Sequence, residues 1–333
     1  MAGHDPLTTT SDVLDQMIEA GMPETPEQLE VTGRLRRFGR KKRGWYRLHE
    51  NIGRTGRAYI TGSFGYWGLI DGQRIRPPQS LDQAELERLR ELAAARRARE
   101  DRVRREAAER AALQSSARWR AGARAGASSY LVRKLIAAPE SLRFEPDGTL
   151  LVPMVRYDLP REAALVGVQS IKADGEKRFA RGTAKRGAAC RIGVVVVGEP
   201  ILVGEGYATC MTLRAAVSAR LPVFVAFDAG NLEPVVEVLQ AAHPQCPILV
   251  CADDDYATSG NPGRAKADRL RRRNGVHMIY PVWPPGASRG PKDTDFNDLH
   301  KCAGLHVVAR QLRAPLRYLG YTGPLAAEIT DAA

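Results

Sequence analysis

The chain has 333 residues, of which 44% are hydrophobic, and it carries a formal net charge of +12. This length is enough for roughly two domains with sizeable cores. No apolar run approaches the ~18 residues that a membrane span needs, and the start lacks a signal-peptide pattern, so we expect a soluble, cytoplasmic protein that binds no membrane. The basic excess favours a polyanionic partner, most often nucleic acid.

The spacing of the cysteines argues against a zinc ribbon, because none of them forms a C-x-x-C pair. We therefore expect no zinc and a buried, reduced thiol at each position. The five positions are Cys190, Cys210, Cys246, Cys251 and Cys302.

The basic charge is concentrated in residues 31–57, which contain ten Lys or Arg and one acid, Glu50. Alternation in "GWYRLHE" and "RAYITGSFGYWGL" predicts short antiparallel strands. Two interpretations of the interleaved aromatics remain open. They form an exposed stacking surface for single-stranded DNA, or they form the core of a small sheet with a basic rim. The candidate single-strand-binding residues are Arg40, Lys41, Lys42, Arg43, Trp45, Tyr46 and Trp67.

The chain changes character from about Leu81 to Ala125, and residues 81–114 are dense in Ala, Glu, Leu and Arg and lack Gly and Pro, which predicts a long helix. Its apolar residues are mostly alanine, so its buried face is thin. We interpret it as an exposed linker with i,i+4 ion pairs, with nucleic-acid contact through its arginines as the alternative. The following "AGARAGASS" (residues 121–129) predicts a flexible break before a second domain.

The second half of the chain alternates between strand and helix patterns. This alternation predicts an α/β fold with a parallel sheet and helices on both faces. In such sheets ligands bind at the carboxyl ends of the strands. The predicted strands cover residues 150–155, 164–171, 191–197, 200–206, 222–227, 247–252 and 276–281, and the predicted helices cover residues 208–220, 232–243 and 262–273.

Carboxylates follow several of these strands, and all would converge on one edge of the sheet. Because residues two apart on an extended segment point to the same side, one ion can bind the first and third aspartates of "ADDD" while Asp254 points away. Oxygen ligands favour Mg²⁺ or Mn²⁺. Any single aspartate is otherwise a helix cap or a loop residue, as we expect for Asp293. The cluster comprises Glu205, Asp253, Asp255, Asp293, Asp295 and Asp298.

A strand ending in Glu-Gly, a helix, and a strand ending in Asp-x-Asp resemble the Toprim domain of DnaG-type primases, topoisomerases and some nucleases. The resemblance is closer to the TraC-like primases of conjugative plasmids and to related phage and mobile-element primases. It rests on "YLVRKLI", "LVGVQSIKADGEKRFARGTAKRG", "EGYATCMTL", "VAFDAGNL", "ADDDYATSGNPGRAKA" and "DFNDLH", and on the N-terminal "GWYRLHE" and "GSFGYWG". It covers about residues 30–75 and 128–312.

The resemblance implies a Toprim-type parallel sheet flanked by helices, a small β-rich N-terminal domain and a long linker helix. The domains are then residues 1–78 for template binding, 79–127 for the linker, 128–198 for the basic part of the catalytic core, 199–313 for the Toprim domain and 314–333 for a tail. DnaG-type enzymes also carry a zinc-binding domain, which nothing here could build. Template selection would then fall to the basic aromatic domain.

The resemblance also assigns roles to individual residues. Glu205 matches an acid that binds metal or acts as general base, and Asp253 and Asp255 match two metal-ligand aspartates. Asp295 falls where the family carries a further acidic pair, but Asn297 replaces its second member and Asp298 follows, so the ligand is either Asp295 or Asp298. The residues implied in nucleotide or template binding are Lys134, Lys177, Arg178, Lys185 and Arg186.

The implied function is DNA primase, a nucleotidyltransferase that makes short primers, expected to be RNA, on single-stranded DNA from nucleoside triphosphates. Two Mg²⁺ or Mn²⁺ ions about 4 Å apart would activate the attacking hydroxyl and stabilise the leaving pyrophosphate. A metal-dependent Toprim nuclease and a non-catalytic single-strand-binding replication factor remain as alternatives. No P-loop pattern is present, so we expect no helicase activity in this chain. A replicative helicase or a conjugation relaxase is a candidate partner.

Overall fold

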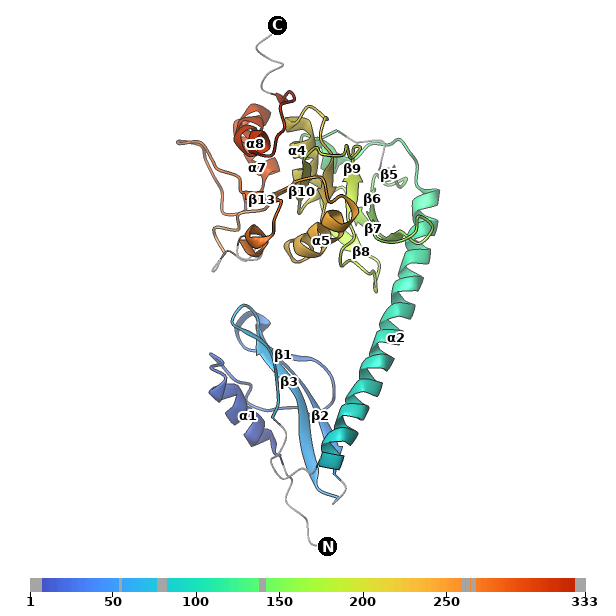
Figure 1. Cartoon of the computed structure of the whole chain (residues 1–333), viewed down its shortest axis with the longest axis vertical. Coiled ribbons are helices and arrows are strands. Elements are labelled where there is room, and N and C mark those ends of the chain that lie inside the picture. The colour runs from blue at the N-terminus through green and yellow to red at the C-terminus, as the bar shows by residue number, and fades with distance from the viewer. Residues whose placement is uncertain are drawn as a thin grey trace. The chain divides into compact units, whose positions relative to one another are not determined.

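The computed structural model describes residues 8–53, 56–76, 83–137, 142–258, 261, 264 and 268–326. The chain divides into an N-terminal unit, residues 1–101, and a C-terminal unit, residues 102–333. Helix α2 (Gln83–Ala121) crosses this boundary (Figure 1). Within the described residues, none of the helices combines the length and the apolar character that a bilayer crossing requires.

The N-terminal unit contains a four-stranded antiparallel meander, as its alternating sequence predicts. One face of this sheet is covered by helix α1 (Thr10–Glu19), whose Val13 and Met17 pack against Leu48. A 3-10 turn at Arg40–Lys42 separates the first two strands. The strands, in the order in which they pair, are β1 (Arg36–Phe38), β2 (Gly44–Ile52), β3 (Ala58–Tyr66) and β4 (Ile70–Arg74).

The aromatic residues of this unit divide between the core and the surface. Tyr46 is only 3% exposed and packs with Phe64 and Tyr66 beneath α1, and its hydroxyl accepts a hydrogen bond from the Glu30 amide at 3.1 Å. The prediction that Tyr46 stacks on a DNA base is therefore wrong, because its ring is enclosed by the small core. Trp67 is exposed.

The long helix is confirmed, but the flexible break predicted after it is wrong. Ala123 exchanges backbone hydrogen bonds of 2.9 Å with Phe144 in both directions, which fixes this connection to the next sheet. A Cβ atom at Gly122 would lie 2.8 Å from the Arg143 side chain, and one at Gly126 would lie 2.6 Å from Phe144. The glycines therefore allow close packing at these positions.

The C-terminal unit begins with a second antiparallel sheet, in which the strands pair in chain order. A short helix, α3 (Ser129–Arg133), leads into it. Two of its strands match the predictions for residues 150–155 and 164–171 closely. The strands are β5 (Arg143–Phe144), β6 (Leu150–Val155), β7 (Leu165–Ile171) and β8 (Lys177–Phe179).

The central sheet of this unit has the order β13-β12-β10-β11-β9, with the first four strands parallel and β9 antiparallel. Its two faces belong to different core clusters, one packed against α4, α7 and α8 and the other against α5. The predicted α/β class is thus confirmed. The strands are β9 (Cys190–Ile192), β10 (Ile201–Gly204), β11 (Val223–Val225), β12 (Ile248–Cys251) and β13 (Val276–Ile279). The helices are α4 (Tyr207–Ala216), α5 (Leu232–Ala242), α7 (Phe296–Ala303) and α8 (Leu305–Tyr318), with 3-10 turns at Ala229–Asn231 and Asp268–Arg272.

Several local predictions for this unit need correction. The strand expected at residues 191–197 ends at Ile192, and Val194 and Val197 are exposed beyond it. Four cysteines are buried as expected, but Cys302 is exposed on α7. Residues 262–263 and 265–267 of the predicted helix at 262–273 lie outside the described residues, and Asp268–Arg272 is a 3-10 turn. Helix α8 continues past the expected domain boundary at residue 313.

Candidate functional site

The carboxyl ends of β10 and β12 bring two acidic residues together. These parallel strands pair with Gly204 opposite Cys251, so Glu205 and Asp253 follow at the same edge. The Asp253 amide donates a hydrogen bond to Glu205 Oε1 at 3.2 Å. Gly204 allows α4 to approach, because a Cβ atom there would lie 2.8 Å from Cys210 Sγ. The predicted convergence of these two acids is therefore present in the fold.

Asp253 lies at the centre of the negative charge on this edge. Burial raises its pKa well above the ordinary value, and the nearby carboxylates of Glu205, Asp295 and Asp255 raise it further, whereas Lys177 acts in the opposite direction. Its Oδ1 atom is shielded from solvent and has no hydrogen-bond partner within the described residues. A buried carboxylate oxygen without a partner is costly unless a cation or a donor reaches it.

Asp295 and Asp298 sit at the start of α7 and have different environments. Asp295 caps the helix, since its Oδ1 accepts a hydrogen bond from the Asp298 amide at 2.8 Å. Burial and the Asp298 carboxylate raise the pKa of Asp295. Asp298 instead accepts from the Thr294 amide at 3.2 Å and lies 3.5 Å from Lys134 Nζ. Asp295 is thus both a helix cap and the α7 carboxylate that repels Asp253.

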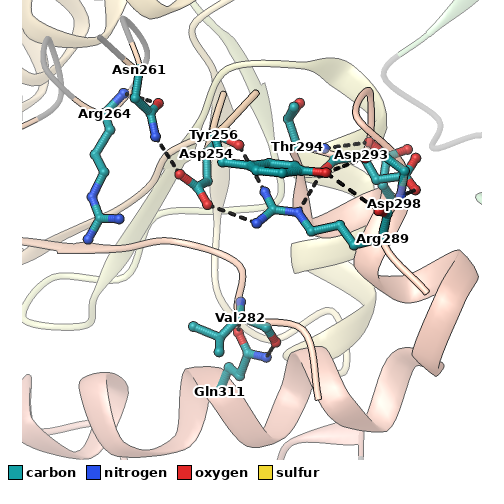
Figure 2. Close-up of polar contacts among 11 residues, drawn as sticks. Asp254, Tyr256, Asn261, Arg264, Val282, Arg289, Asp293, Thr294, Asp298 and Gln311 are labelled. Atoms are coloured by element: carbon teal, nitrogen blue, oxygen red, sulfur yellow. Dashed lines mark hydrogen bonds and ion pairs between the residues drawn. The ribbon is translucent and has the colours of Figure 1, made fainter. Parts of the chain in front are cut away.

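Asp254 points into a separate network, as the alternation along the segment predicts (Figure 2). Its carboxylate accepts hydrogen bonds from Asn261 Nδ2 at 2.6 Å and from Arg289 at 3.1 Å. Arg289 also donates to the Asp254 backbone carbonyl at 2.9 Å. The middle aspartate of the triplet is therefore neutralised by a guanidinium and does not add its charge to the cluster around Asp253.

Arg289 acts as a clamp between two segments that are distant in sequence. Its guanidinium lies between the rings of Tyr256 and Trp283, 3.7 Å and 4.0 Å from their centroids, and its Nε donates to the Asp293 carbonyl at 2.9 Å. The Asp254 amide in turn donates to the Thr294 carbonyl at 2.8 Å. These contacts fix the end of β12 against the start of α7 (Figure 2). Asp293, as expected, serves the loop, where it accepts from the Gly290 amide at 2.7 Å.

A pocket of about 330 Å³ opens beside the carboxylates. Three cationic side chains line it, those of Arg133, Lys134 and Lys177, together with the N-terminus of α4 and the carboxylates of Asp174 and Asp295. The α4 N-cap, Gly206, has no side chain to cap the first amides of the helix. A helix N-terminus and convergent cations favour a bound anion, so this pocket is suited to phosphate groups.

Lys177 and Lys134 are placed in this pocket by different means. Strand β8 lies at the surface, but the Lys177 ammonium reaches inward to the N-terminus of α4, where a Cβ atom at Gly206 would lie 3.7 Å from its nitrogen. Desolvation lowers the pKa of Lys177, as does Lys134, while Asp295 and Asp253 oppose the shift. Asn297 is buried and donates to the Lys134 carbonyl at 2.7 Å, which holds the segment that carries Lys134.

The structure does not bring the other predicted phosphate-binding residues to this pocket. Arg178 pairs with Glu176 at 2.5 Å on its own hairpin. Lys185 forms an ion pair with Asp228 after β11. Arg186 is exposed and lies 3.9 Å from Glu237. Sequence reasoning also missed Arg289 and its two aromatic neighbours, because their contacts join segments that no local pattern relates.

The carboxylates do not form a preassembled metal site. Within the described residues, no three His, Cys, Asp or Glu side chains lie close enough to hold an ion together. The chemistry of the donors nevertheless fits a hard divalent cation, because the carboxylates are oxygen ligands and one shielded oxygen of Asp253 has no partner there. Glu205, Asp253 and Asp255 are the residues that would hold it, with Asp295 beside them.

No protein-family model matches the chain. It is similar to two Escherichia coli proteins named DNA primase TraC, with 37% and 35% identity over 133 residues, which is 38% of this chain. The chain spans only 12% and 9% of the length of these relatives.

Among solved structures, the primase fragment of the bacteriophage T7 primase-helicase protein matches 51% of this chain and 66% of its own length, with 15% identity and a TM-score of 0.38. A bacteriophage T7 lagging-strand DNA polymerase assembly with two primase domains matches 55% of this chain and 83% of the other chain, with 16% identity and a TM-score of 0.37.

The chain is similar to the TraC primases. The resemblance that the motifs predict is therefore confirmed, and it rests on the sequence identity.

The clamp predicts a large effect of removing Arg289. Replacing Arg289 with Ala leaves the Asp254 carboxylate, whose side chain is 12% exposed, without its guanidinium. We expect a loss of about 3–5 kcal/mol in the free energy of unfolding of the C-terminal unit, because a buried charge loses its partner. Urea denaturation measures it. The control Arg269→Ala, on an exposed side chain, should change stability by less than about 0.5 kcal/mol. Equal stability of the two variants would contradict the conclusion that Arg289 stabilises this unit by neutralising Asp254.

The raised pKa of Asp253 predicts that Asp253→Asn stabilises the metal-free protein. Folded Asp253 binds its proton more tightly than the unfolded chain does, so stability is lost as the pH rises above about 4. The Asp253→Asn variant has no ionisable group at this position, so it does not lose this stability as the pH rises. Near pH 7 in a chelator we expect its Tm to rise by roughly 2–4 °C, equivalent to about 1 kcal/mol, with a smaller gain at lower pH.

The matched control is Asp147→Asn, in an exposed turn where hydrogen bonds from Thr149 lower the aspartate pKa. This variant removes the same charge and should gain no stability. A Tm for Asp253→Asn that stays at or below that of the parent protein near pH 7 would mean that the carboxylate cluster is not strained by repulsion.

Proposed function

We propose that this chain is a DNA primase, which joins nucleotides into short RNA primers on single-stranded DNA for the replication or transfer of a mobile genetic element. The observation that carries the proposal is the position of Glu205 and Asp253 beside the pocket that contains Lys134 and Lys177. The similarity to the TraC primases supports it. Because the chain spans about a tenth of those proteins, the activity, template and nucleotides are all parts of the proposal.

The pocket supplies what a nucleoside triphosphate needs. Lys134 and Lys177 neutralise phosphate charge, and the uncapped N-terminus of α4 offers backbone amides as donors. The ion pair between Lys134 and Asp298 and the contact between Asn297 and the Lys134 carbonyl hold the first cation in place. A preorganised cation stabilises developing phosphate charge more than a mobile one does, because it needs no reorganisation during the reaction.

The carboxylates place a strong negative charge next to these cations. Mg²⁺ or Mn²⁺ bound at Glu205, Asp253 and Asp255 would activate the attacking 3′-hydroxyl and stabilise the leaving pyrophosphate. The chain itself keeps Asp254 out of this cluster through Arg289 and keeps Asp295 at its border as a helix cap. Lys177, whose ammonium is influenced by both Asp295 and Asp253, sits between the acidic edge and the phosphate pocket.

The proposal predicts that removing one acidic charge abolishes primer synthesis. With single-stranded DNA, labelled ribonucleotides and Mg²⁺, we expect gel electrophoresis to show labelled products of a few nucleotides. Glu205→Gln, Asp253→Asn and Asp255→Asn keep the side-chain shape and should lower the yield by at least about 10²-fold. Asp147→Asn, far from the cluster in sequence and on an exposed turn, is the matched control and should retain full activity.

Other outcomes of the same assay identify other functions. Shortened template without labelled product, lost in Asp253→Asn, indicates a metal-dependent nuclease. Template binding that is equal with and without metal, and no product of either kind, indicates an accessory binding factor. Undiminished synthesis by Asp253→Asn would remove the acidic edge from the proposed mechanism.

The pocket predicts that Lys177 and Lys185 differ in their effects on nucleotide binding. Lys177→Gln removes a cation that lines the pocket, so we expect the Kd for a fluorescent nucleoside triphosphate to rise by about tenfold, or 1.4 kcal/mol. Lys185→Gln removes a cation that is paired with Asp228 and should raise it less. Lys172→Gln, at the same β7–β8 turn but outside the pocket, is the control. Equal Kd values for all three variants would contradict the assignment of the pocket.

A further inference from the structure

The sheet of the N-terminal unit has two unlike faces. One packs on α1 through apolar side chains. On the other, the cross-strand partners in the middle of the strands are polar or basic, because Arg47 pairs with Ser63, His49 with Thr61, and Ser63 with Arg74 in the strand register. Directly paired residues project to the same face of a sheet. This second face therefore presents hydrogen-bonding and cationic groups in place of an apolar core.

The first turns of α2 lie over this polar face and leave a groove of about 490 Å³. Arg47 and Arg74 line it on the sheet side, and Arg90, Arg96 and Arg97 line it on the helix side. Glu100 is the one acid among the described residues that line the groove, and it is bound to Arg47 at 3.1 Å. Both walls of the groove thus carry arginines, which lie among the apolar side chains of Ile75, Leu86, Leu89 and Leu92.

The described residues balance only part of the positive charge of the groove. For Arg74, Arg90, Arg96 and Arg97 the structure records no ion pair with any described residue. Burial lowers the pKa of His49, and repulsion from Arg96 and Arg47 lowers it further. The groove therefore disfavours the protonation of His49. Like charges gathered on two facing walls are unfavourable unless an anion lies between them.

We propose that this groove binds the sugar–phosphate backbone of single-stranded nucleic acid. Arg97 follows Arg90 by seven helical residues, about 10 Å, which is on the order of three phosphate spacings along a stacked strand. Hydroxyls of Thr61 and Ser63 on the sheet side add donors that contact phosphate and sugar without reading sequence.

The same sheet face continues toward aromatic residues that suit a single strand. Trp45 precedes Arg47 by two residues on β2 and is half-buried, paired with Arg37 across the sheet. Arg37 lies 5.6 Å from the ring of exposed Trp67. Rings beside cations stack bases in proteins that bind single strands. These aromatic groups favour nucleic acid over an acidic polypeptide as the occupant of the groove.

The inference rests on the proposed function only in treating the bound strand as a primase template. Binding of a fluorescent oligothymidylate to the full-length protein, without nucleotides, tests the groove itself. The variant Arg90→Gln/Arg96→Gln/Arg97→Gln keeps helix propensity. It should bind at least about tenfold more weakly, with a salt-dependence slope smaller by roughly 2, because three phosphate contacts are lost.

The matched control is Arg99→Gln/Arg102→Gln/Arg105→Gln, which removes the same charge from α2 at exposed positions that do not line the groove. It should bind within about threefold of the parent protein. The variant Arg90→Lys/Arg96→Lys/Arg97→Lys keeps the charge and should retain most of the affinity. This result would assign the weaker binding of the glutamine variant to its lost charge and not to a disturbed fold.

Three outcomes overturn the inference. They are equal binding by the groove variant and its control, no binding of single strands by the parent protein, and displacement of the oligothymidylate by polyglutamate at equal charge concentration. Normal binding through the groove by a protein that makes no primers leaves the inference intact and instead removes the proposed function. The two failures are therefore distinguishable.

Discussion

Repulsion between carboxylates at the carboxyl edge of the central sheet is the constraint around which the C-terminal unit is arranged. Four-residue strands, buried on both faces, end side by side, and Glu205 beyond one of them accepts a hydrogen bond from the Asp253 amide beyond the other. Acids that follow such strands cannot move apart without breaking the sheet register. The surrounding residues therefore determine which of the charges are neutralised and which remain.

Neutralisation is selective along the edge. Arg289 binds Asp254, and Lys134 lies next to Asp298, so in each acidic segment one carboxylate has a cationic partner. The neighbouring carboxylates, those of Asp253 and Asp295, have raised pKa values. The negative potential is thereby concentrated at one place beside Lys177 and the start of α4. In the proposed function a divalent cation would bind on one side of this place and phosphate groups on the other.

The N-terminal unit separates stability from binding in a similar way. Its small core lies between α1 and one face of the sheet, and Tyr46, Phe64 and Tyr66 belong to it. The opposite face does not contribute apolar side chains to that core and carries arginines instead. Placing α2 over this face encloses a basic groove without burying the charges completely, since most of the helix arginines remain exposed.

Much of this protein follows from the sequence by itself. The four-residue apolar runs of β10 and β12, and the alternation in β2 and β3, report directly on burial, because each residue's environment in a strand depends on its immediate neighbours. The order of strands and helices then places Glu205 and Asp253 on one edge.

Only the tertiary structure decided the rest. Sequence could not relate Arg289 to Asp254, Lys185 to Asp228, or the arginines of α2 to the sheet that they face. It also could not tell that Tyr46 is buried while Trp67 is exposed, or that the glycines at 122 and 126 pack closely instead of giving flexibility. In each case the deciding partner lies many residues away. A local pattern specifies which side chains are available, and only the packing of distant segments specifies which of them meet.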